Sequence, residues 1–377
     1  MKIKHLLTAA LFVFFFTSLS AQPNYRKEIK IPDIPGYKSL KCDFHSHTVF
    51  SDGTVWPTFR IEEAWRSGLD AIAITDHIEY QPHKDYVPTN HNAAYEIGNA
   101  LADQLGIILI HGSEITRSMP PGHLNAIFIT DANALVKDDW RDAIKEAVKQ
   151  GGLVFWNHPG WTGQQPDGVA RWYDEHTYLL ENKLISGIEV VNSIEYYPTV
   201  FEWCLEKKLA ILGNSDIHNP IEFDYVNTRR PVTLVFAKTA SSEGIKDGIM
   251  NRRTAIFYDG KLYGEEKYLD PLFRSSVKFE TTTVNTVGRS TANIKVTNNS
   301  DIDFELRLEG TDEKIRFPEY IKLLAGTTMM FPVRARKDDT DVKKKYSVVY
   351  AVENLITGAE KNLKLNLDFN IKVTPKK

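Results

Sequence analysis

The sequence contains Asp43-Phe44-His45-Ser46-His47-Thr48, and Ser51-Asp52-Gly53 follows after two residues. The first stretch lies at the end of a strand predicted over residues 40–44, where two histidines two positions apart point their rings to the same side. Asp52 adds a carboxylate a few loop residues later. Imidazole together with carboxylate suits Zn, Mn or Fe. The stretch therefore predicts a metal-binding segment, whereas the alternative is a polar loop with incidental histidines.

Strands and helices alternate on both sides of this stretch. Predicted strands cover residues 40–44, 69–75, 107–110, 124–130, 153–156, 187–191, 209–212 and 231–236. Predicted helices cover residues 57–67, 91–105, 138–150 and 199–208, and the segment 243–258 completes the region. Such alternation predicts a parallel sheet covered by helices. About seven units in roughly 240 residues fit a closed α/β barrel.

Further His, Asp and Glu residues stand where these strands end. The full set of candidates is His45, His47, Asp52, His77, Glu114, His123, His158, Asp216 and His218. Barrel active sites lie at the rim formed by the carboxyl ends of the strands, which is where nearly all of the candidates fall. His123 is the exception, since it precedes its strand and must reach the site from a loop. The placement predicts a metal site, and the alternative treats each histidine as an ordinary surface or core residue.

The pattern of apolar and polar residues changes from about residue 271. Segments such as 277–280, 292–296, 304–308 and 363–367 alternate apolar with polar residues, and turn residues separate them. This pattern predicts an all-β module of about 100 residues, most simply an immunoglobulin-like sandwich. The module contains no histidine. We therefore assign it packing, a lid or attachment rather than chemistry.

The composition and the first residues indicate which partners to expect and where in the cell the protein is located. With 377 residues, 42% hydrophobic and 25% charged, the chain has an ordinary globular balance, and its net charge of −3 gives no case for nucleic acid. Lys2 and Lys4 precede a short apolar run over residues 6–16, and small residues follow it. This pattern predicts a signal peptide at 1–21, export to the periplasm or beyond, and no stable membrane insertion after cleavage. An uncleaved anchor is the alternative. The domains expected after it cover residues 22–268 and 269–377.

Taken together, the candidates form a set of motifs that resembles one family. The motifs are His45-Ser46-His47-Thr48 with Ser51-Asp52-Gly53, Thr75-Asp76-His77, Gly112-Ser113-Glu114, His123 before a strand, Asn157-His158-Pro159, and Asn214-Ser215-Asp216-Ile217-His218. They resemble the PHP (polymerase and histidinol phosphatase) superfamily of metallophosphoesterases over roughly residues 40–258. The resemblance implies a distorted (β/α)7 barrel of PHP type. Its pairing with a β-sandwich in an exported chain resembles proteins near the haloalkyl-phosphate phosphodiesterases.

The resemblance also implies a grouping of metal ligands around two or three divalent transition-metal ions (Mn, Zn or Fe). One ion would take His45, His47, Glu114 and Asp216, a second would share Glu114 and add His123 and His158, and a third would take Asp52, His77 and His218. Three carboxylates and six neutral imidazoles cannot neutralise three divalent ions. The resulting positive cavity would attract a phosphate group.

The expected activity is hydrolysis of a small phosphodiester or phosphomonoester by attack of a metal-bridging hydroxide. Glu114 and Asp216 carry catalytic roles in this hypothesis. Arg117 is the expected clamp on the phosphate, with a rim salt bridge as its alternative, and His91 is a further substrate contact. Competing hypotheses are a metal-dependent hydrolase of an amide-type bond and a non-catalytic binding protein. The oligomeric state stays open.

Overall fold

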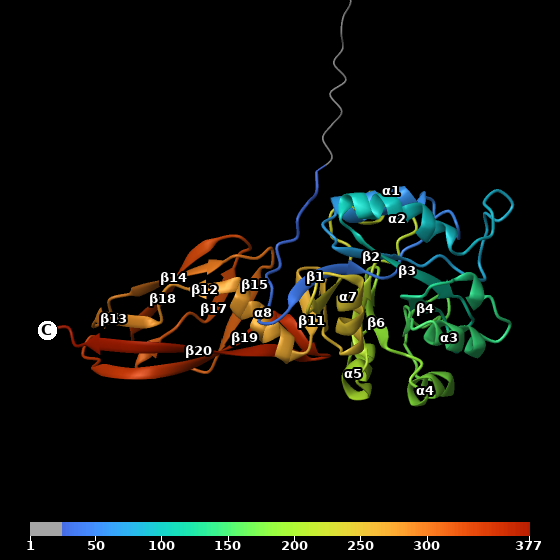
Figure 1. The fold of residues 1–377 in the computed structure, drawn as a ribbon. Helices are drawn as coiled ribbons and strands as arrows, with labels where there is room; N and C mark the ends of the chain where they lie inside the picture. The colour runs from blue at the N-terminus through green and yellow to red at the C-terminus, as the bar shows by residue number, and fades with distance from the viewer. Residues whose placement is uncertain (1–24) are drawn as a thin grey trace, which may run out of the picture.

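The computed structural model describes residues 25–377, so the signal peptide expected at 1–21 lies outside the described residues. Two parts lie side by side along the long direction of the molecule (Figure 1). The N-terminal part mixes helices and strands, and the C-terminal part consists of strands, two of which run from its far end back to the first part. Among residues 25–377, no helix is both long and apolar enough to cross a membrane.

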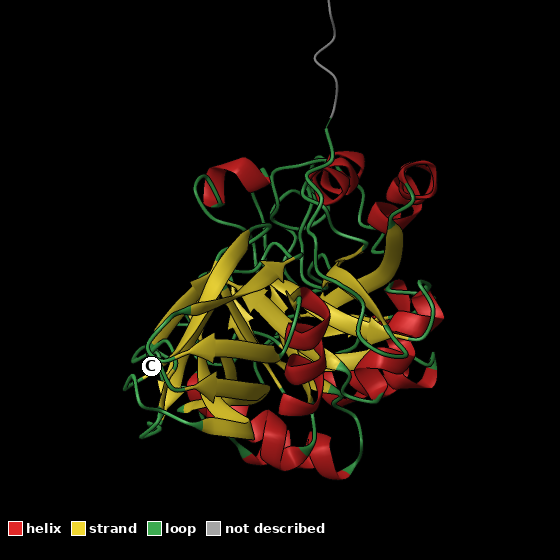
Figure 2. Ribbon diagram, turned by 90° about the vertical axis from the view of Figure 1, so that its left-hand side faces the viewer, coloured by secondary structure: helices red, strands yellow, loops and turns green. Residues whose placement is uncertain are grey.

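The N-terminal part is built from short buried strands with helices around them (Figure 2). Its strands are β1 Lys38–Asp43, β2 Ala71–Ile74, β3 Ile108–Ile115, β4 Leu124–Ile127, β5 Leu153–Trp156, β6 Gly187–Asn192, β7 Glu195–Tyr196, β8 Ala210–Asn214, β9 Val232–Ala237, β10 Thr254–Tyr258 and β11 Lys261–Gly264. Its helices are α1 Pro57–Arg66, α2 Ala93–Leu105, η1 Asn133–Leu135, α3 Trp140–Lys149, α4 Asp174–Glu181, α5 Pro198–Lys207, α6 Ile221–Asp224, α7 Ser242–Met250 and α8 Glu266–Ser276. Most of the strands are buried along their whole length, as expected where helices cover a sheet.

The sheet order is β7-β6-β5-β4-β3-β2-β1-β9-β10-β11, with β8 on the other edge of β6. Strand pairs β1·β2, β2·β3, β5·β6 and β6·β8 are parallel. The prediction of a parallel sheet is wrong at β3·β4, β4·β5, β1·β9 and β9·β10, which are antiparallel. No helix separates β3 from β4, so the chain turns back and β4 pairs beside the strand it has just left.

Side chains, rather than a backbone ladder, connect β8 to the strands across the barrel. The Thr233 hydroxyl accepts from the Gly213 N–H at 2.9 Å and lies 2.8 Å from the Gly213 carbonyl. The Thr254 hydroxyl accepts from the Ile211 N–H at 3.1 Å. A Cβ at Gly213 would lie 2.4 Å from the Ile256 side chain, so glycine is the residue that fits this close approach. The barrel is therefore distorted where β8 meets β9 and β10, and the expected distorted α/β barrel is confirmed.

The C-terminal part is an all-β sandwich, as the alternating segments predict. Its strands are β12 Val277–Phe279, β13 Thr283–Val287, β14 Ala292–Asn298, β15 Phe304–Glu309, β16 Ile315–Arg316, β17 Tyr320–Leu323, β18 Thr328–Ala335, β19 Val342–Gly358 and β20 Lys361–Thr374. Along β20, buried and exposed positions alternate, so that one face packs inward. Phe304, Phe331 and Phe369 are among the buried side chains of this core.

The two parts share one sheet, because β19 pairs with β11 in parallel through Leu355 and Ile356. The domain boundary predicted between residues 268 and 269 falls inside α8. Phe273 of α8 packs against Phe304 of the sandwich, with ring centroids 5.0 Å apart. The helix thus belongs to the joint between the two parts, and the exact domain limits stay a prediction.

Candidate metal centre

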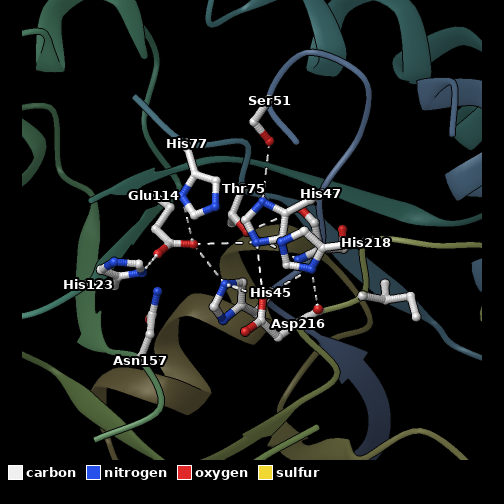
Figure 3. A network of polar contacts seen from close by, with 12 residues as sticks. His45, His47, Ser51, Thr75, His77, Glu114, His123, Asn157, Asp216 and His218 are labelled. Carbon is white, nitrogen blue, oxygen red and sulfur yellow. Dashed lines mark hydrogen bonds and ion pairs between the residues drawn. The ribbon is translucent and has the colours of Figure 1, made fainter. Parts of the chain in front are cut away.

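The nine ligand candidates converge at the rim of the barrel. Figure 3 shows how seven of them lie, namely His45, His47, His77, Glu114, His123, Asp216 and His218. The nine candidates come from the segments that follow β1, β2, β5 and β8, from β3 itself and from the turn before β4. Seven of them line one cavity of about 580 Å³, and His45 and His47 are fully buried beside it. We call it the histidine cavity; its lining also includes Tyr80, Trp161, Ile194 and Glu195.

Glu114 lies in the middle of the group (Figure 3), and its two oxygens face different histidines. Oε2 lies 2.9 Å from His45 Nε2, 3.4 Å from His47 Nε2 and 3.5 Å from His77 Nδ1. Oε1 lies 2.6 Å from His123 Nδ1. The carboxylate is fully buried. A single side chain therefore connects two sets of potential ligands.

Asp216 and Asp52 complete the arrangement on the other side of His47. Asp216 Oδ1 lies 3.1 Å from Nε2 of both His45 and His47, and Asp216 Oδ2 lies 4.0 Å from His158 Nε2. Asp52 approaches His77 Nε2 at 3.4 Å and His218 Nε2 at 3.3 Å.

Three overlapping groups have ligand atoms close enough to share an ion, within 4.8 Å of one another. They are His47, Asp52, His77 and His218; His45, His47 and Glu114; and His77, Glu114 and His123.

Orphaned polar atoms test whether these residues fit a metal. Glu114 Oε1, His123 Nδ1 and His158 Nδ1 are buried and have no hydrogen-bond partner among the described residues. The 2.6 Å approach of Glu114 Oε1 to His123 Nδ1 lacks the geometry of a hydrogen bond. Leaving such atoms unpaired costs about 1–3 kcal/mol each. Imidazole and carboxylate that converge in this way fit divalent transition-metal ions.

Electrostatics keep His47, Glu114 and Asp216 in forms that can bind a cation. At His45, His77 and His218, burial disfavours the protonated ring, but facing carboxylates outweigh burial and raise the pKa. Burial, together with His218 and His77, lowers the pKa of His47 to about 3, so that its imidazole is neutral. Burial opposes ionisation of Glu114, but His77, His123 and His45 outweigh it and hold its pKa well below the usual range. In the same way His45, His47 and His218 together outweigh the effect of burial at Asp216, whose pKa is also held well below its usual range.

Two ligand candidates adopt left-handed backbone conformations. The φ angle is +29° at His158 and +53° at Asp216. Non-glycine residues in sparsely populated regions cost on the order of 1–3 kcal/mol and persist where their surroundings fix them. The N–H of Asp216 donates to the His45 carbonyl at 3.0 Å, and the N–H of His158 donates to Glu189 Oε2 at 2.9 Å. These hydrogen bonds fix the backbone at both positions, and the fixed backbone sets the direction of each side chain.

Glu189 is a functional residue that the sequence reasoning missed. It is fully buried in β6, and its Oε1 lies 2.9 Å from His45 Nδ1. Its other oxygen accepts from the N–H of His158 and from the Asn192 side chain. A carboxylate on one ring nitrogen fixes the imidazole so that the other nitrogen faces the metal. The available signal was a lone acidic residue inside an apolar strand.

Asp43 and Asp76 hold the ligand loops rather than the ligand rings. Asp76 accepts from the Thr48 N–H at 2.7 Å, from the Thr48 hydroxyl and from the Ser51 hydroxyl. Asp43 accepts from the Ser215 N–H at 3.1 Å and from the Ser215 hydroxyl at 2.5 Å. Each aspartate therefore fixes a segment that presents metal-ligand candidates.

The structure does not bring Arg117 and His91 to this group. The Arg117 guanidinium lies 2.7 Å from Glu79 and donates to the carbonyls of Lys137 and Asp138. His91 lies beside Gln81, and neither residue lines the histidine cavity. Arg117 follows the end of β3, and its side chain is held by the neighbouring loop instead of pointing inward. Among the described residues that line the cavity, none is lysine or arginine.

Comparison with known proteins agrees with this geometry. The PHP domain family matches residues 43–198, and an Ig-like domain family matches residues 277–368. A two-domain protein from Bacteroides vulgatus, described as containing a predicted PHP-like metal-dependent phosphoesterase, is 43% identical in sequence. The similarity covers 92% of this chain and 100% of that one, with a TM-score of 0.86.

Two further matches are partial. A structure from Bifidobacterium adolescentis, described as that of a candidate metal-dependent phosphoesterase, is 18% identical, with a TM-score of 0.37; the similarity covers 49% of this chain and 90% of that one. An uncharacterised protein of Methanocaldococcus jannaschii is 38% identical over 82 residues, which is 22% of this chain and 36% of that protein's length. The extensive match to the Bacteroides vulgatus protein decides the assignment. This chain belongs to the PHP family, in a two-domain form that joins a PHP-like metal-dependent phosphoesterase fold to a C-terminal Ig-like domain.

Proposed function

We propose that this protein hydrolyses a small phosphodiester or phosphomonoester at the histidine cavity with the help of two or three divalent ions, Mn, Zn or Fe. The observation that carries the proposal is the position of Glu114, whose two oxygens face separate sets of histidines. The ions, when bound, would lower the pKa of water and offset charge on the phosphate oxygens.

The residues of the chain supply position and charge in this proposal. Glu114 and Asp216 hold negative charge between the imidazoles, and Glu189 fixes the ring of His45 through Nδ1. His45 Nε2 then faces Glu114 and Asp216 together. The proposed catalytic roles of Glu114 and Asp216 are therefore those of metal-ligand carboxylates that keep the site in one geometry.

The residues that line the cavity favour a substrate with a single phosphate group of low charge and an apolar organic group. No lysine or arginine stands among the described lining residues, so charge on the phosphate would be met by the ligand cluster and its ions. Trp161 and Tyr80, which are 42% and 52% exposed, both line the cavity. The Trp161 ring lies 5.2 Å from that of His158, and the Tyr80 ring lies 5.9 Å from that of His77. Both aromatic rings thus stand beside ligand candidates, where they could stack against a flat organic group of the ester.

The test uses purified protein supplied in turn with Mn, Zn or Fe. Hydrolysis of bis-p-nitrophenyl phosphate and p-nitrophenyl phosphate is followed by release of nitrophenolate, and metal content is measured in the same samples. We expect more than one ion per chain, hydrolysis of at least one substrate, and loss of activity after chelation. Protein that binds metal but hydrolyses neither ester would contradict the proposal. The ratio of the two rates decides between a diesterase and a monoesterase.

We also propose that the chain is exported after cleavage near residue 21, which would leave residues 22–268 and 269–377 as the mature domains. Support comes from Lys2, Lys4 and the apolar run that follows them. Mass spectrometry of protein from separated cell fractions is expected to find a chain beginning near residue 22 outside the cytoplasm. An intact N-terminus in the membrane fraction would favour an uncleaved anchor instead.

A further inference from the structure

A second cavity, of about 350 Å³, lies outside the histidine cavity and shares none of its lining residues. It is enclosed by the N-terminal segment, α1 and the segment from α6 to the start of β9. Four of its lining residues are basic and two are acidic. We call it the arginine cavity, and its charged lining consists of Lys27, Glu63, Arg66, Glu222, Arg229 and Arg230.

Arg230 is the central feature of this cavity. Its side chain is only 3% exposed, and its Nη1 donates to Asp43 Oδ2 at 3.0 Å. Its Nε and Nη2 are buried and have no hydrogen-bond partner among the described residues. Nη1 of the adjacent Arg229 is also buried and has no hydrogen-bond partner among the described residues. Hydrogen bonds to charged donors are strong, so leaving several of them unmet in one buried place is costly.

The acidic residues of the cavity do not meet these donors. The two oxygens of Glu63 accept from Arg60 Nη1 and from the N–H of Ile221, each at 2.6 Å. Glu222 lies 3.1 Å from Arg66 Nη2, which is its ion-pair partner. Arg229 Nη1 and Arg230 Nε and Nη2 therefore remain without an acceptor among the described residues, while Asp43 pairs with Nη1 of Arg230.

We propose that the arginine cavity is a second, non-catalytic binding site for a small oxyanion of the phosphate type. A guanidinium presents parallel N–H donors that match two oxygens of such a group, and two adjacent guanidiniums present more donors than one carboxylate accepts. The volume admits a free phosphate or the phosphate group of a small organic molecule. This inference does not rest on the proposed hydrolytic activity.

The same contacts connect the arginine cavity to the metal-ligand loops. Asp43, which accepts from Arg230, also accepts from the N–H of His45 at 3.3 Å and from the N–H and hydroxyl of Ser215. His45 and Asp216, the residue after Ser215, are both ligand candidates. An anion that draws Arg230 toward itself acts on the carboxylate that fixes both segments. Occupancy of the arginine cavity is therefore expected to change the metal affinity of the histidine cavity.

Diffraction locates the site directly. Crystals of the metal-loaded protein are soaked in selenate, whose selenium scatters anomalously and marks its position. We expect a peak within hydrogen-bond distance of the Arg229 and Arg230 guanidiniums, separate from any peak at the histidine cavity. A soaked crystal with no peak in the arginine cavity would overturn the proposal, whatever is found at the histidine cavity.

Binding in solution supplies the matched control. Association of inorganic phosphate with the metal-loaded protein is measured at constant ionic strength, set with chloride, for wild type, Arg229→Ala and Arg66→Ala. Both variants remove one positive charge from the same lining, but Arg66 already has Glu222 as a partner. We expect association at this site to weaken at least tenfold in Arg229→Ala and less than threefold in Arg66→Ala. Equal weakening in both would show general charge attraction and overturn a built site.

Two further measurements identify the kind of anion that binds and confirm which cavity holds it. Phenylphosphonate, which carries a phosphate-like group on an organic ring, separates a site for organic phosphates from one for the free anion: preference for either identifies the source. The variant Glu114→Gln, which disturbs only the histidine cavity, is expected to keep the selenate peak between Arg229 and Arg230. Loss of that peak in Glu114→Gln would mean that the anion belongs to the histidine cavity after all, against the proposal.

Discussion

At the scale of single residues, Glu114 connects more of the site than any other side chain described above. It lies within 3.5 Å of a ring nitrogen of His45, His47, His77 and His123. In Glu114→Gln, an amide replaces the negative charge and one of the two ligand oxygens. We expect metal content to fall by at least one ion per chain and kcat/KM to fall roughly 1000-fold, the several kcal/mol that metal assistance supplies. Elemental analysis and steady-state kinetics measure both, and unchanged metal content would exclude Glu114 as a ligand.

Glu189 offers a test of a positioning residue. In Glu189→Gln, the carboxylate that holds His45 Nδ1 becomes an amide, which still has one oxygen for the His158 N–H. Loss of such outer partners typically lowers metal affinity about 10- to 100-fold. Competition with a chelator measures that affinity. Glu195→Gln is the control, because Glu195 lines the same cavity but bonds to Tyr197; equal affinity in both variants would remove the role assigned to Glu189.

Arg117 is expected to matter little for catalysis. Its guanidinium is occupied by Glu79 and two carbonyls, away from the cavity lining. Arg117→Ala should therefore change kcat/KM by less than about threefold and stability by about 1 kcal/mol or less, as for other partly exposed ion pairs. Kinetics on both nitrophenyl esters provide the measurement. A loss of about 100-fold or more would instead match a lost transition-state donor and return Arg117 to the phosphate.

At the scale of elements, β8 shows how strand placement and site geometry depend on each other. Its Gly213 N–H and carbonyl are both within hydrogen-bond distance of the Thr233 hydroxyl of β9, and its end leads directly to Asp216 and His218. Thr233→Val keeps the shape of the side chain but leaves two buried backbone groups without this partner. We expect the free energy of unfolding to fall by about 2–6 kcal/mol, at about 1–3 kcal/mol per group.

Denaturant unfolding measures the effect of Thr233→Val, and metal affinity should fall with it because the Asp216 segment loses its support. Thr297→Val is the matched control, since the hydroxyl of Thr297 bonds to Thr328 at an exposed position of the sandwich. That variant should leave both quantities within about 0.5 kcal/mol of wild type. The same effect in both variants would mean that the β8 contact carries no special weight.

At the scale of the whole molecule, the Ig-like domain completes the sheet and the core of the PHP-like part. β19 pairs with β11, and Phe273 of α8 packs on Phe304. A chain that ends after residue 276 would expose the edge of β11 and the apolar face of α8. We expect its Tm to be lower by about 10 °C or more, given about 2–4 °C for each kcal/mol in a chain of this size. Calorimetry of the truncated chain measures this, and an unchanged Tm would show two independent domains.

Local patterns in the sequence were enough to predict the fold class and the candidate ligands. Alternating strands and helices, ligands at strand ends and the period-two segments after residue 271 predicted a distorted α/β barrel with an Ig-like sandwich, which is confirmed. The nine ligand candidates lie around one cavity because the carboxyl ends of neighbouring strands meet, while their roles as ligands stay a prediction.

The directions of the strands, the partner of Arg117 and the contact of Glu189 with His45 became known from the folded structure alone. Strand direction depends on which edge a returning strand finds, and the contact between Glu189 and His45 joins residues 144 positions apart. The two unmet donors of Arg230 likewise follow from what surrounds the side chain, not from its neighbours in sequence. Long-range packing fixes these features, because burial and partner choice arise only when distant segments are brought together.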